Sequence, residues 1–209
     1  MIKYIILLFF SIFLLSGCGD TLSTSTTDDS ANITKSLLTG TWTAKCNDNT
    51  TASTSSKTVL VFSASGDNLA ATTTNYSDLS CVTQSSVFTK KLNTLVLGSK
   101  TTTSQNQIIH KFTALVSDIT LEPKDNDTTT SFSLNSICGL SGWSIGNEKS
   151  IAGQTCGSIT YNAVNDTHSD IIQINSEKTF IRLGNITNPA STGASTGYPK
   201  TLYSEEYYK

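Results

Sequence analysis

Threonine and serine dominate this chain, and they limit the secondary structure that it can form. The 209 residues include 34 Thr and 30 Ser, but only one Arg and five Glu. Threonine favours strands and serine favours turns. Exposed helices are usually filled with Ala, Glu, Lys and Arg. The composition therefore predicts an all-β protein and argues against a helical bundle.

The charge balance bears on the partners of the chain. The formal net charge is −2, and no basic run is longer than Lys90-Lys91. Nucleic-acid binding needs a basic patch or stripe. We therefore expect no nucleic-acid partner.

The first residues have the features of an export signal. Lys3 supplies a positive charge, and residues 4–15 are apolar except for Ser11. A helix that crosses a bilayer needs about 20 apolar residues. The shorter run predicts a signal peptide over residues 1–17.

The sequence Leu-Ser-Gly-Cys at residues 15–18 closes this segment. It resembles the lipobox of bacterial lipoproteins, in which the cysteine thiol receives a diacylglyceryl group and the signal is cut before it. The small residues Ser16 and Gly17 leave the thiol accessible. The resemblance implies that Cys18 is lipidated and that acyl chains hold the mature protein at a membrane. An ordinary secretory signal that ends in cysteine is the alternative.

The residues after Cys18 bear on the choice of membrane and on the start of the folded domain. Inner-membrane lipoproteins typically carry Asp directly after the cysteine, whereas here Gly19 precedes Asp20. The resemblance therefore implies the outer membrane of a bacterial cell envelope. The segment up to residue 36 is nearly all Thr, Ser, Asp and Asn, too polar to fold alone. Residues 18–36 are expected to be a flexible tether.

Four further cysteines, Cys46, Cys81, Cys138 and Cys156, allow three pairings. An exported, oxidising setting favours disulfides over metal ligands. Pairing of neighbours along the chain, Cys46 with Cys81 and Cys138 with Cys156, is the expected one, and the other two pairings stay open.

No metal or cofactor site is predicted. The four cysteines contain no C-x-x-C pair, and His110 and His168 lack any H-E-x-x-H context. Residues 125–127, Asp-Asn-Asp, have carboxylates two apart but lack the Gly and the distant Glu of a calcium loop. They predict a plain turn.

Alternating apolar residues separated by turns predict a succession of strands. The strongest signals are two hairpins, formed by residues 58–62 with 69–76 and by residues 170–175 with 179–184. Further strands are expected at residues 41–46, 81–89, 91–97, 108–121, 131–138 and 158–163. About 8–10 strands without β-α-β alternation predict an antiparallel barrel or sandwich over residues 37–189. The Tyr-rich tail, residues 190–209, is expected to lie along this domain.

Three spaced motifs resemble those of lipocalins. Gly40-Thr41-Trp42 is similar to the G-x-W motif of the first barrel strand, and residues 169–171, Ser-Asp-Ile, stand where lipocalins have a T-D-Y-like segment. Arg182 stands where lipocalins carry an Arg that packs on that Trp. The resemblance implies an antiparallel lipocalin-like barrel closed by a Trp42–Arg182 pair, with about 0.5–2 kcal/mol of cation–π attraction. The alternatives are a core tryptophan and a solvated strand arginine.

Other features of this segment agree with or depart from the resemblance. Bacterial lipocalin-like lipoproteins have a Cys after the opening strand and another after a Tyr-Ser-Asp segment, as at Cys46 and at residues 76–81. In contrast, residues 136–157 look inserted, and no amphipathic helix follows the last strand. These departures put a ligand cavity in doubt more than the barrel.

The sequence Gly-Trp-Ser-Ile-Gly at residues 142–146 fits the G-x-S-x-G motif of α/β-hydrolases, and Asp166 and His168 follow in the order of their triad. That motif works only between a strand and a helix that helps to hold the oxyanion. The residues after Ser144 are too few and too rich in Gly for that helix, so no catalytic residue is predicted.

Three functional hypotheses remain. The leading one is a non-enzymatic, outer-membrane-anchored binding module for a small apolar or amphipathic ligand, because an eight-stranded barrel can hold one small ligand. The second is a structural or surface-interaction lipoprotein, adhesin-like, with a solid core. The third is a serine esterase that uses Ser144.

Overall fold

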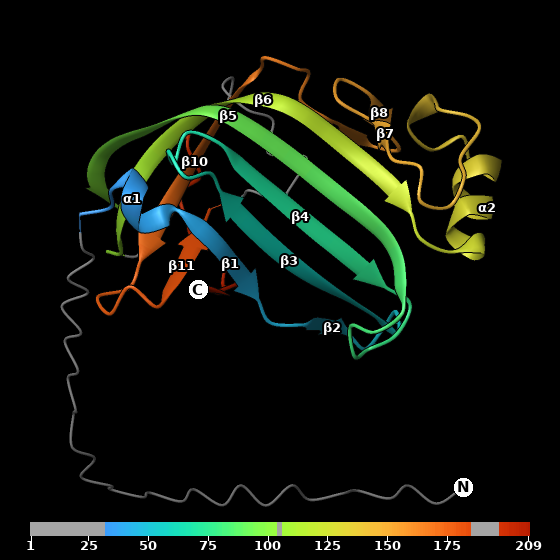
Figure 1. Ribbon diagram of the computed structural model, residues 1–209, viewed down its shortest axis with the longest axis horizontal. Coiled ribbons are helices and arrows are strands. Elements are labelled where there is room, and N and C mark those ends of the chain that lie inside the picture. The colour runs from blue at the N-terminus through green and yellow to red at the C-terminus, as the bar shows by residue number, and fades with distance from the viewer. Residues whose placement is uncertain (1–31, 104–105, 185–196) are drawn as a thin grey trace, which may run out of the picture.

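The computed structural model describes residues 32–103, 106–184 and 197–209 (Figure 1). The predicted signal peptide, Cys18 and most of the tether lie outside these residues. No helix within the described ranges has the length and apolar character needed to cross a membrane.

The described chain is built mainly from strands, with short helices at two places (Figure 1). In chain order the elements are α1 (Lys35–Leu38), β1 (Gly40–Ala44), β2 (Asn47–Asn49), β3 (Thr54–Phe62), β4 (Leu69–Tyr76), β5 (Gln84–Thr102), β6 (Ile108–Pro123), α2 (Asn126–Leu134), the 3-10 helix η1 (Ile137–Gly139), β7 (Lys149–Ser150), β8 (Thr155–Cys156), β9 (Ile159–Thr160), β10 (Thr167–Ile174), β11 (Phe180–Leu183) and β12 (Tyr207–Tyr208).

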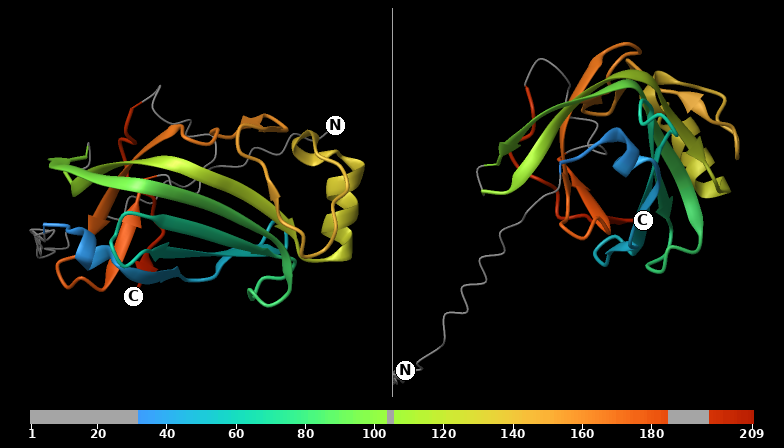
Figure 2. Two further views of the ribbon diagram at one scale, coloured as in Figure 1. Left: turned by 45° about the horizontal axis from the view of Figure 1, so that its top comes forward. Right: turned by 60° about the vertical axis from the view of Figure 1, so that its left-hand side comes forward.

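The main sheet closes on itself as an antiparallel ring. Its order is β1-β12-β11-β10-β6-β5-β4-β3, and β3 pairs back with β1. Figure 2 shows these strands arranged around a common axis. The expected all-β, antiparallel architecture is therefore confirmed. Strands that are neighbours in the ring also follow one another among the ring strands along the chain, and the segment from α2 to β9 is inserted between β6 and β10.

Both hairpins expected from the sequence are present. In the first, Phe62 of β3 lies opposite Leu69 of β4. Its turn needs a glycine at position 66, where φ is +70° and an added Cβ would lie 2.6 Å from the Cβ of Lys35. In the second hairpin, Ile172 of β10 lies opposite Leu183 of β11.

The end of the ring beside α1 is filled with apolar side chains. Those that are at most 2% exposed include Trp42, Leu60, Leu69, Leu92 and Phe112. The Nε1–H group of Trp42 donates a hydrogen bond of 2.7 Å to the Leu38 carbonyl at the end of α1. The helix therefore covers this end, and the interior beside it is a packed core.

The sheet is closed where β1 pairs with β3, at residues 40–43 and 59–62. On the side away from α1, the long strands β3 to β6 continue beyond the ring, with β2 paired to β3 and β7 paired to β6. Helix α2 and the small β8-β9 sheet lie at this end (Figure 1). Residues 136–157, which look inserted relative to lipocalins, contain η1, β7 and β8 at this end.

Two strand predictions were wrong. Residues 81–89 and 91–97 were expected as separate strands, but β5 runs through Gln84–Thr102. Irregularities in its pairing with β6, such as the one between Lys91 and Leu92, let one long strand bend around the barrel. Residues 131–138 were expected as a strand, but they belong to α2, to a turn and to η1.

The start of α2 also corrects the turn expected at residues 125–127. Asp125 is the N-cap of the helix, and its Oδ1 atom accepts a hydrogen bond of 2.7 Å from the Thr128 amide. This cap starts a helix even though the segment is rich in Thr. The Tyr-rich tail was expected to lie along the barrel domain. Instead, Tyr207 and Tyr208 form β12, which pairs with β1 and β11 and closes the ring.

Candidate functional site

The two expected disulfides are present. Cys46 is bonded to Cys81, with 6.0 Å between their Cα atoms, and Cys138 is bonded to Cys156. The first ties the chain just after β1 to the loop between β4 and β5. The second ties η1 to β8 within the segment that follows β6.

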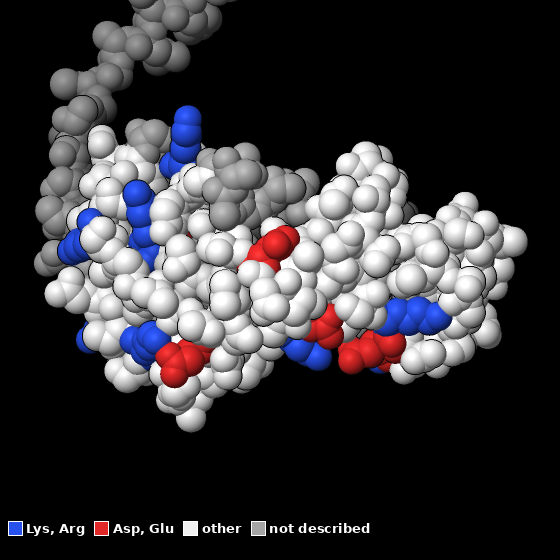
Figure 3. All heavy atoms as spheres, turned by 90° about the horizontal axis from the view of Figure 1, so that it is seen from above, with Lys and Arg blue, Asp and Glu red and all other residues white. Residues whose placement is uncertain are grey.

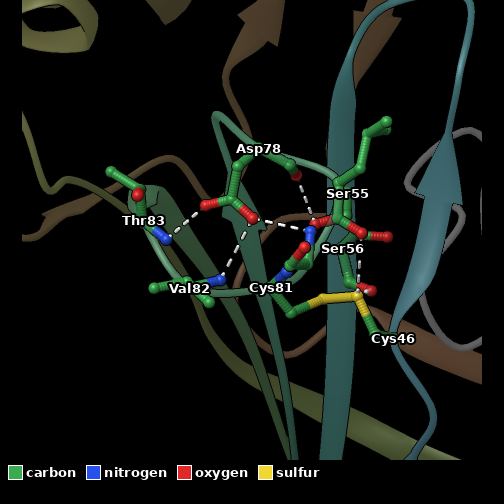
Figure 4. Close-up of a disulfide and its surroundings, with 9 residues drawn as sticks. Cys46, Ser55, Ser56, Asp78, Cys81, Val82 and Thr83 are labelled. Atoms are coloured by element: carbon green, nitrogen blue, oxygen red, sulfur yellow. Dashed lines mark hydrogen bonds between the residues drawn. A yellow bond between two sulfur atoms is a disulfide. The ribbon is translucent and has the colours of Figure 1, made fainter.

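The loop at residues 77–83 is held by the carboxylate of Asp78 (Figure 4). One oxygen of Asp78 accepts from the amides of Ser80, at 2.6 Å, and Val82, at 3.3 Å. The other accepts from the amide of Thr83 at 2.5 Å. These amide donors lower the pKa of Asp78 below its ordinary value of 3.8. The ionised carboxylate of Asp78 therefore stabilises the loop through three backbone hydrogen bonds.

Strand β3 joins this loop to the disulfide (Figure 4). The Ser55 hydroxyl donates to the Asp78 carbonyl at 2.7 Å and accepts from the Cys81 amide at 3.1 Å. Cys81 in turn is bonded to Cys46, one residue before β2. Strands β2 and β3 and the loop therefore form one braced unit.

A polar cavity lies against this braced unit. Its volume is about 390 Å³, and its walls come from the ends of four strands. The lining residues are β2 (Asn47–Asn49), residues 54–56 of β3, Asn75 and Tyr76 of β4, and Ser85 of β5. We call this space the β2 cavity. Asp48 is its one charged lining residue.

Several lining groups are free to bind a ligand. Asn47 lies opposite Ser56, so their side chains share one face of the sheet. Within the described chain, neither of these two side chains has a hydrogen-bond partner. Tyr76 is 7% exposed and lies opposite Ser55, so its ring is buried on the other face of the sheet. In contrast, Ser55 and Asn75 are held by neighbours, since Asn75 Nδ2 donates to Ser86 Oγ at 3.0 Å. The β2 cavity thus combines a fixed frame with unused donors and acceptors.

The interior also contains a line of three ionisable side chains, which we call the buried charge line. Lys90 of β5 and His168 and Asp170 of β10 are each at most 1% exposed. Lys90 Nζ lies 3.1 Å from His168 Nδ1, and His168 Nε2 lies 3.5 Å from Asp170 Oδ2. Because a protonated lysine can only donate, Nδ1 accepts and the imidazole proton sits on Nε2, facing Asp170.

Burial shifts the pKa values of this line. Loss of hydration lowers the pKa of Lys90 from 10.5 to about 8, although the charge of Asp170 acts in the opposite direction. Loss of hydration also lowers the pKa of His168 below 6.5, with Asp170 again opposing. At neutral pH the line therefore holds a cationic lysine and a neutral histidine.

The predicted pair of Trp42 and Arg182 is wrong. Arg182 stands between the buried Ile181 and Leu183 on β11, so its side chain points to the opposite face of the sheet, away from the core. There it forms an ion pair with Glu206. The cation above the Trp42 ring is Lys209, whose Nζ lies 5.1 Å from the ring centroid.

The hydrolase-like residues do not come together. Ser144 is exposed in the loop before β7, and Asp166 is exposed as well. His168 is buried in the sheet interior, where its Nδ1 contacts Lys90. Trp143, which precedes the serine, packs edge-on against Phe132 of α2 and is part of the hydrophobic core.

The other histidine has structural partners. His110 Nε2 accepts from the Ile33 amide at 3.4 Å, and its Nδ1 lies 3.4 Å from the Gly98 carbonyl. No cluster of three or more His, Cys, Asp or Glu side chains that could hold a metal occurs among the residues that the model describes.

Sequence reasoning missed both the β2 cavity and the buried charge line. A signal for Lys90 existed, because it is in phase with Phe88 and Leu92 on one face of its strand. The cavity residues carried none, since Asn, Ser and Thr occur throughout the chain. On the face drawn in Figure 3, most of the surface belongs to neutral residues, and the acidic and basic side chains are scattered over it.

Comparison of the chain with protein-family models and with curated proteins found no match.

Proposed function

We propose that this protein is a lipid-anchored binding module of the bacterial outer membrane, without enzymatic activity, and that its ligand occupies the β2 cavity. The observation that carries the proposal is the cavity itself, a space of about 390 Å³ with a frame braced by a disulfide and with unpaired polar side chains. Binding sites are usually preformed, concave and of about 300–1,000 Å³.

A ligand in the β2 cavity would lie away from the packed interior beside α1. The end beside α1 is filled by Trp42, Leu60, Phe112 and their neighbours, so a wholly apolar ligand has no room there. The β2 cavity instead suits a small ligand with polar groups. The up-and-down order of the eight ring strands supports a lipocalin-like barrel as the scaffold.

The anchor rests on the sequence Leu-Ser-Gly-Cys at residues 15–18. It is tested by expressing the full chain in a diderm bacterium with an alkyne fatty acid, with and without globomycin. We expect label on the protein, enrichment in outer-membrane fractions and loss of both in Cys18→Ala. Unchanged processing and location of Cys18→Ala would contradict the anchor.

The binding function is tested on the lipidated full chain purified in mild detergent. Native mass spectrometry after release from the detergent should reveal a retained small molecule, and its occupancy should fall when Asn47 and Ser56 are both changed to Ala. A protein that carries no ligand and binds none in a broad metabolite screen would contradict a binding module.

A surface-interaction role is the second candidate. The observation that favours it is the packed interior beside α1, where the largest side chains are at most 2% exposed. A solid barrel can serve as a rigid platform without any cavity ligand. Capture of a macromolecular partner that is unaffected by changes in the β2 cavity would favour this role.

A further inference from the structure

The charged side chains of the described chain divide unequally between the two ends of the barrel. One end, which we call the α1 end, contains α1, the β3–β4 and β10–β11 turns and the tip of the β5–β6 hairpin (Figure 1). The opposite end, which we call the α2 end, contains β2, the loop at residues 77–83, α2 and β7 (Figure 1). No face carries a dense patch, but the two ends differ in the sign of their charge.

Lysines dominate the α1 end. The described chain places six of them there, namely Lys35, Lys100, Lys111, Lys178, Lys200 and Lys209. Its two acidic residues at this end are Asp67, which forms an ion pair with Lys35, and Glu177 in the β10–β11 turn. The described residues of the α1 end therefore carry a net charge of +4.

Carboxylates dominate the α2 end. Six acidic residues of the described chain lie there, namely Asp48, Asp78, Glu122, Asp125, Asp127 and Glu148, against the three lysines Lys57, Lys124 and Lys149. Strand β6 joins the two ends, and its 16 residues extend over about 50 Å. Because the Debye length is about 10 Å at 0.1 M salt, each end meets a charged surface largely by itself.

Two of the lysines at the α1 end share a depression on the outside of the sheet. Lys111 of β6 lies opposite the buried Ile171 of β10, so the two side chains share one face. Residues 101–103 of β5 and residues 198–200 of the tail complete the walls of a space of about 310 Å³. Lys111 and Lys200 line it, and no acidic residue does. A phosphate group in this depression meets two positive charges and no negative one.

The folded domain begins at the α1 end. The amide of Ile33 donates to Nε2 of His110 near the start of β6, and α1 follows directly. Fourteen residues separate Cys18 from Ile33. A chain of that length spans at most about 50 Å. An anchor on Cys18 therefore keeps the α1 end within this distance of the membrane, with the α2 end farther along the barrel.

We infer that the α1 end docks on an anionic phospholipid surface and holds the barrel upright on it, an inference that rests on the proposed lipid anchor. Lysines near such a surface are attracted by its headgroups, whereas carboxylates are repelled. Both effects favour contact through the α1 end. This orientation leaves the β2 cavity, at the α2 end, far from the membrane and open to ligands that arrive from water.

Three aspartates of the predicted tether, Asp20, Asp28 and Asp29, do not alter this preference. They stay near the membrane in every orientation of an anchored barrel, because they lie between Cys18 and the folded domain. Their repulsion from anionic lipid therefore applies equally to contact through either end. The difference between the two ends of the barrel is left to set the orientation.

The experiment uses the lipidated full chain inserted through its acyl chains into lipid nanodiscs. One set of discs contains phosphatidylcholine alone, and the other contains equal amounts of phosphatidylcholine and phosphatidylglycerol, each with a trace of a lipid that carries a paramagnetic headgroup. Line broadening of backbone amides in NMR spectra reports which end lies near the headgroups. In the anionic discs we expect several-fold more broadening at Gln107 and Lys178 than at Asp125 and Asp127. Raising the salt concentration should reduce this difference.

Variants connect the orientation to the lysines of the α1 end. We expect Lys178→Glu combined with Lys200→Glu to remove most of the difference between the two ends in anionic discs. The matched control is Lys57→Glu combined with Lys91→Glu, which makes the same change in net charge away from the α1 end and should keep that end at the membrane. Both lysines of the test variant are exposed, so the fold should be retained.

Three results would overturn the inference. One is equal broadening of the two ends in anionic discs, and another is the same preference for the α1 end in neutral discs, which would assign it to something other than anionic lipid. The third is an orientation that the Lys178 and Lys200 variant keeps as well as the control does. A chain that receives no acyl groups and does not stay on either disc would instead contradict the anchor itself.

Discussion

Lys90 and His168 meet inside the sheet, with the lysine Nζ 3.1 Å from Nδ1 of the imidazole. Neither side chain is more than 1% exposed, and Asp170 lies on the far side of the imidazole, 3.5 Å from its Nε2. The imidazole therefore separates a buried cation from a buried carboxylate. Buried ions carry a desolvation cost of several kcal/mol unless they are well compensated.

The first prediction concerns stability in alkali. The pKa of Lys90 is about 8 in the folded protein, whereas its ordinary value is 10.5. At pH values between these two, the unfolded chain therefore binds more protons than the folded one. The free energy of unfolding therefore rises with pH from about 8, by at most about 1.4 kcal/mol per unit. Urea unfolding at intervals from pH 7 to 10 should show a gain of about 2 kcal/mol.

The window ends near pH 10 because burial raises the pKa of Tyr207 far above its usual 10. Above pH 10 the unfolded chain loses that proton first, so stability falls again. The matched control is Lys91→Met, which removes a partly exposed lysine of the same strand and should keep the rise. Lys90→Met should abolish it, and a rise that persists in Lys90→Met would refute the assignment.

The second prediction concerns the counter-charge. Asp170→Asn removes the carboxylate that favours the charged form of Lys90. We expect it to destabilise the protein by about 3–5 kcal/mol at pH 7, because the lysine charge is left buried without compensation. The double variant Lys90→Met with Asp170→Asn should recover much of this loss. Urea midpoints measure both, and equal values for the single and double variants would show that the two charges are not coupled.

The sequence predicted the fold class because alternation is a local property of a strand. Residues 170–175 and 179–184 alternate apolar and polar residues around a short turn, and they form β10 and β11. The helix α2 was missed because Thr and Ser have low helix propensity, whereas its start depends on a single cap, Asp125. The strand β12 was missed because its pairing joins residues far apart in the chain.

The candidate site could not be predicted from the sequence, for a different reason. The β2 cavity gathers Asn47, Ser56 and Tyr76 from three strands, and none of them differs in type from many exposed residues elsewhere. Lys90 stands beside Lys91 and gives a short basic run typical of a solvated strand. Lys90 is buried only because it alternates in step with the core-facing residues of β5. The bends of β5 make that alternation hard to follow along the whole strand.

The third prediction separates Trp42 from Arg182. Trp42→Ala should cost about 3–5 kcal/mol, because it empties a packed core site and removes the hydrogen bond to Leu38. Arg182→Ala should cost less than about 1 kcal/mol, since its ion pair with Glu206 is partly exposed. A double-mutant cycle measured by thermal or urea unfolding should give no coupling between the two residues. A coupling energy above about 1 kcal/mol would contradict this prediction and indicate that Trp42 and Arg182 interact.

The fourth prediction concerns the two disulfides. In the chain-entropy model, the Cys46–Cys81 link over 35 residues contributes about 4 kcal/mol and the Cys138–Cys156 link over 18 residues about 3 kcal/mol. Changing either pair to Ser should lower stability by about these amounts or somewhat less. Only the first pair braces the loop at residues 77–83, so only its removal should speed amide hydrogen exchange at Val82 and Thr83.

The Cys138–Cys156 variant is thus the matched control for that local effect. Asp78→Ala supplies the complementary change, because it keeps the disulfide but removes the carboxylate that accepts the Ser80, Val82 and Thr83 amides. We expect it to speed exchange in the loop as well, and more so at Thr83, which has the shortest of the three hydrogen bonds. Exchange in the loop that responds equally to both disulfide variants would show that the β2 cavity is not held by Cys46 and Cys81.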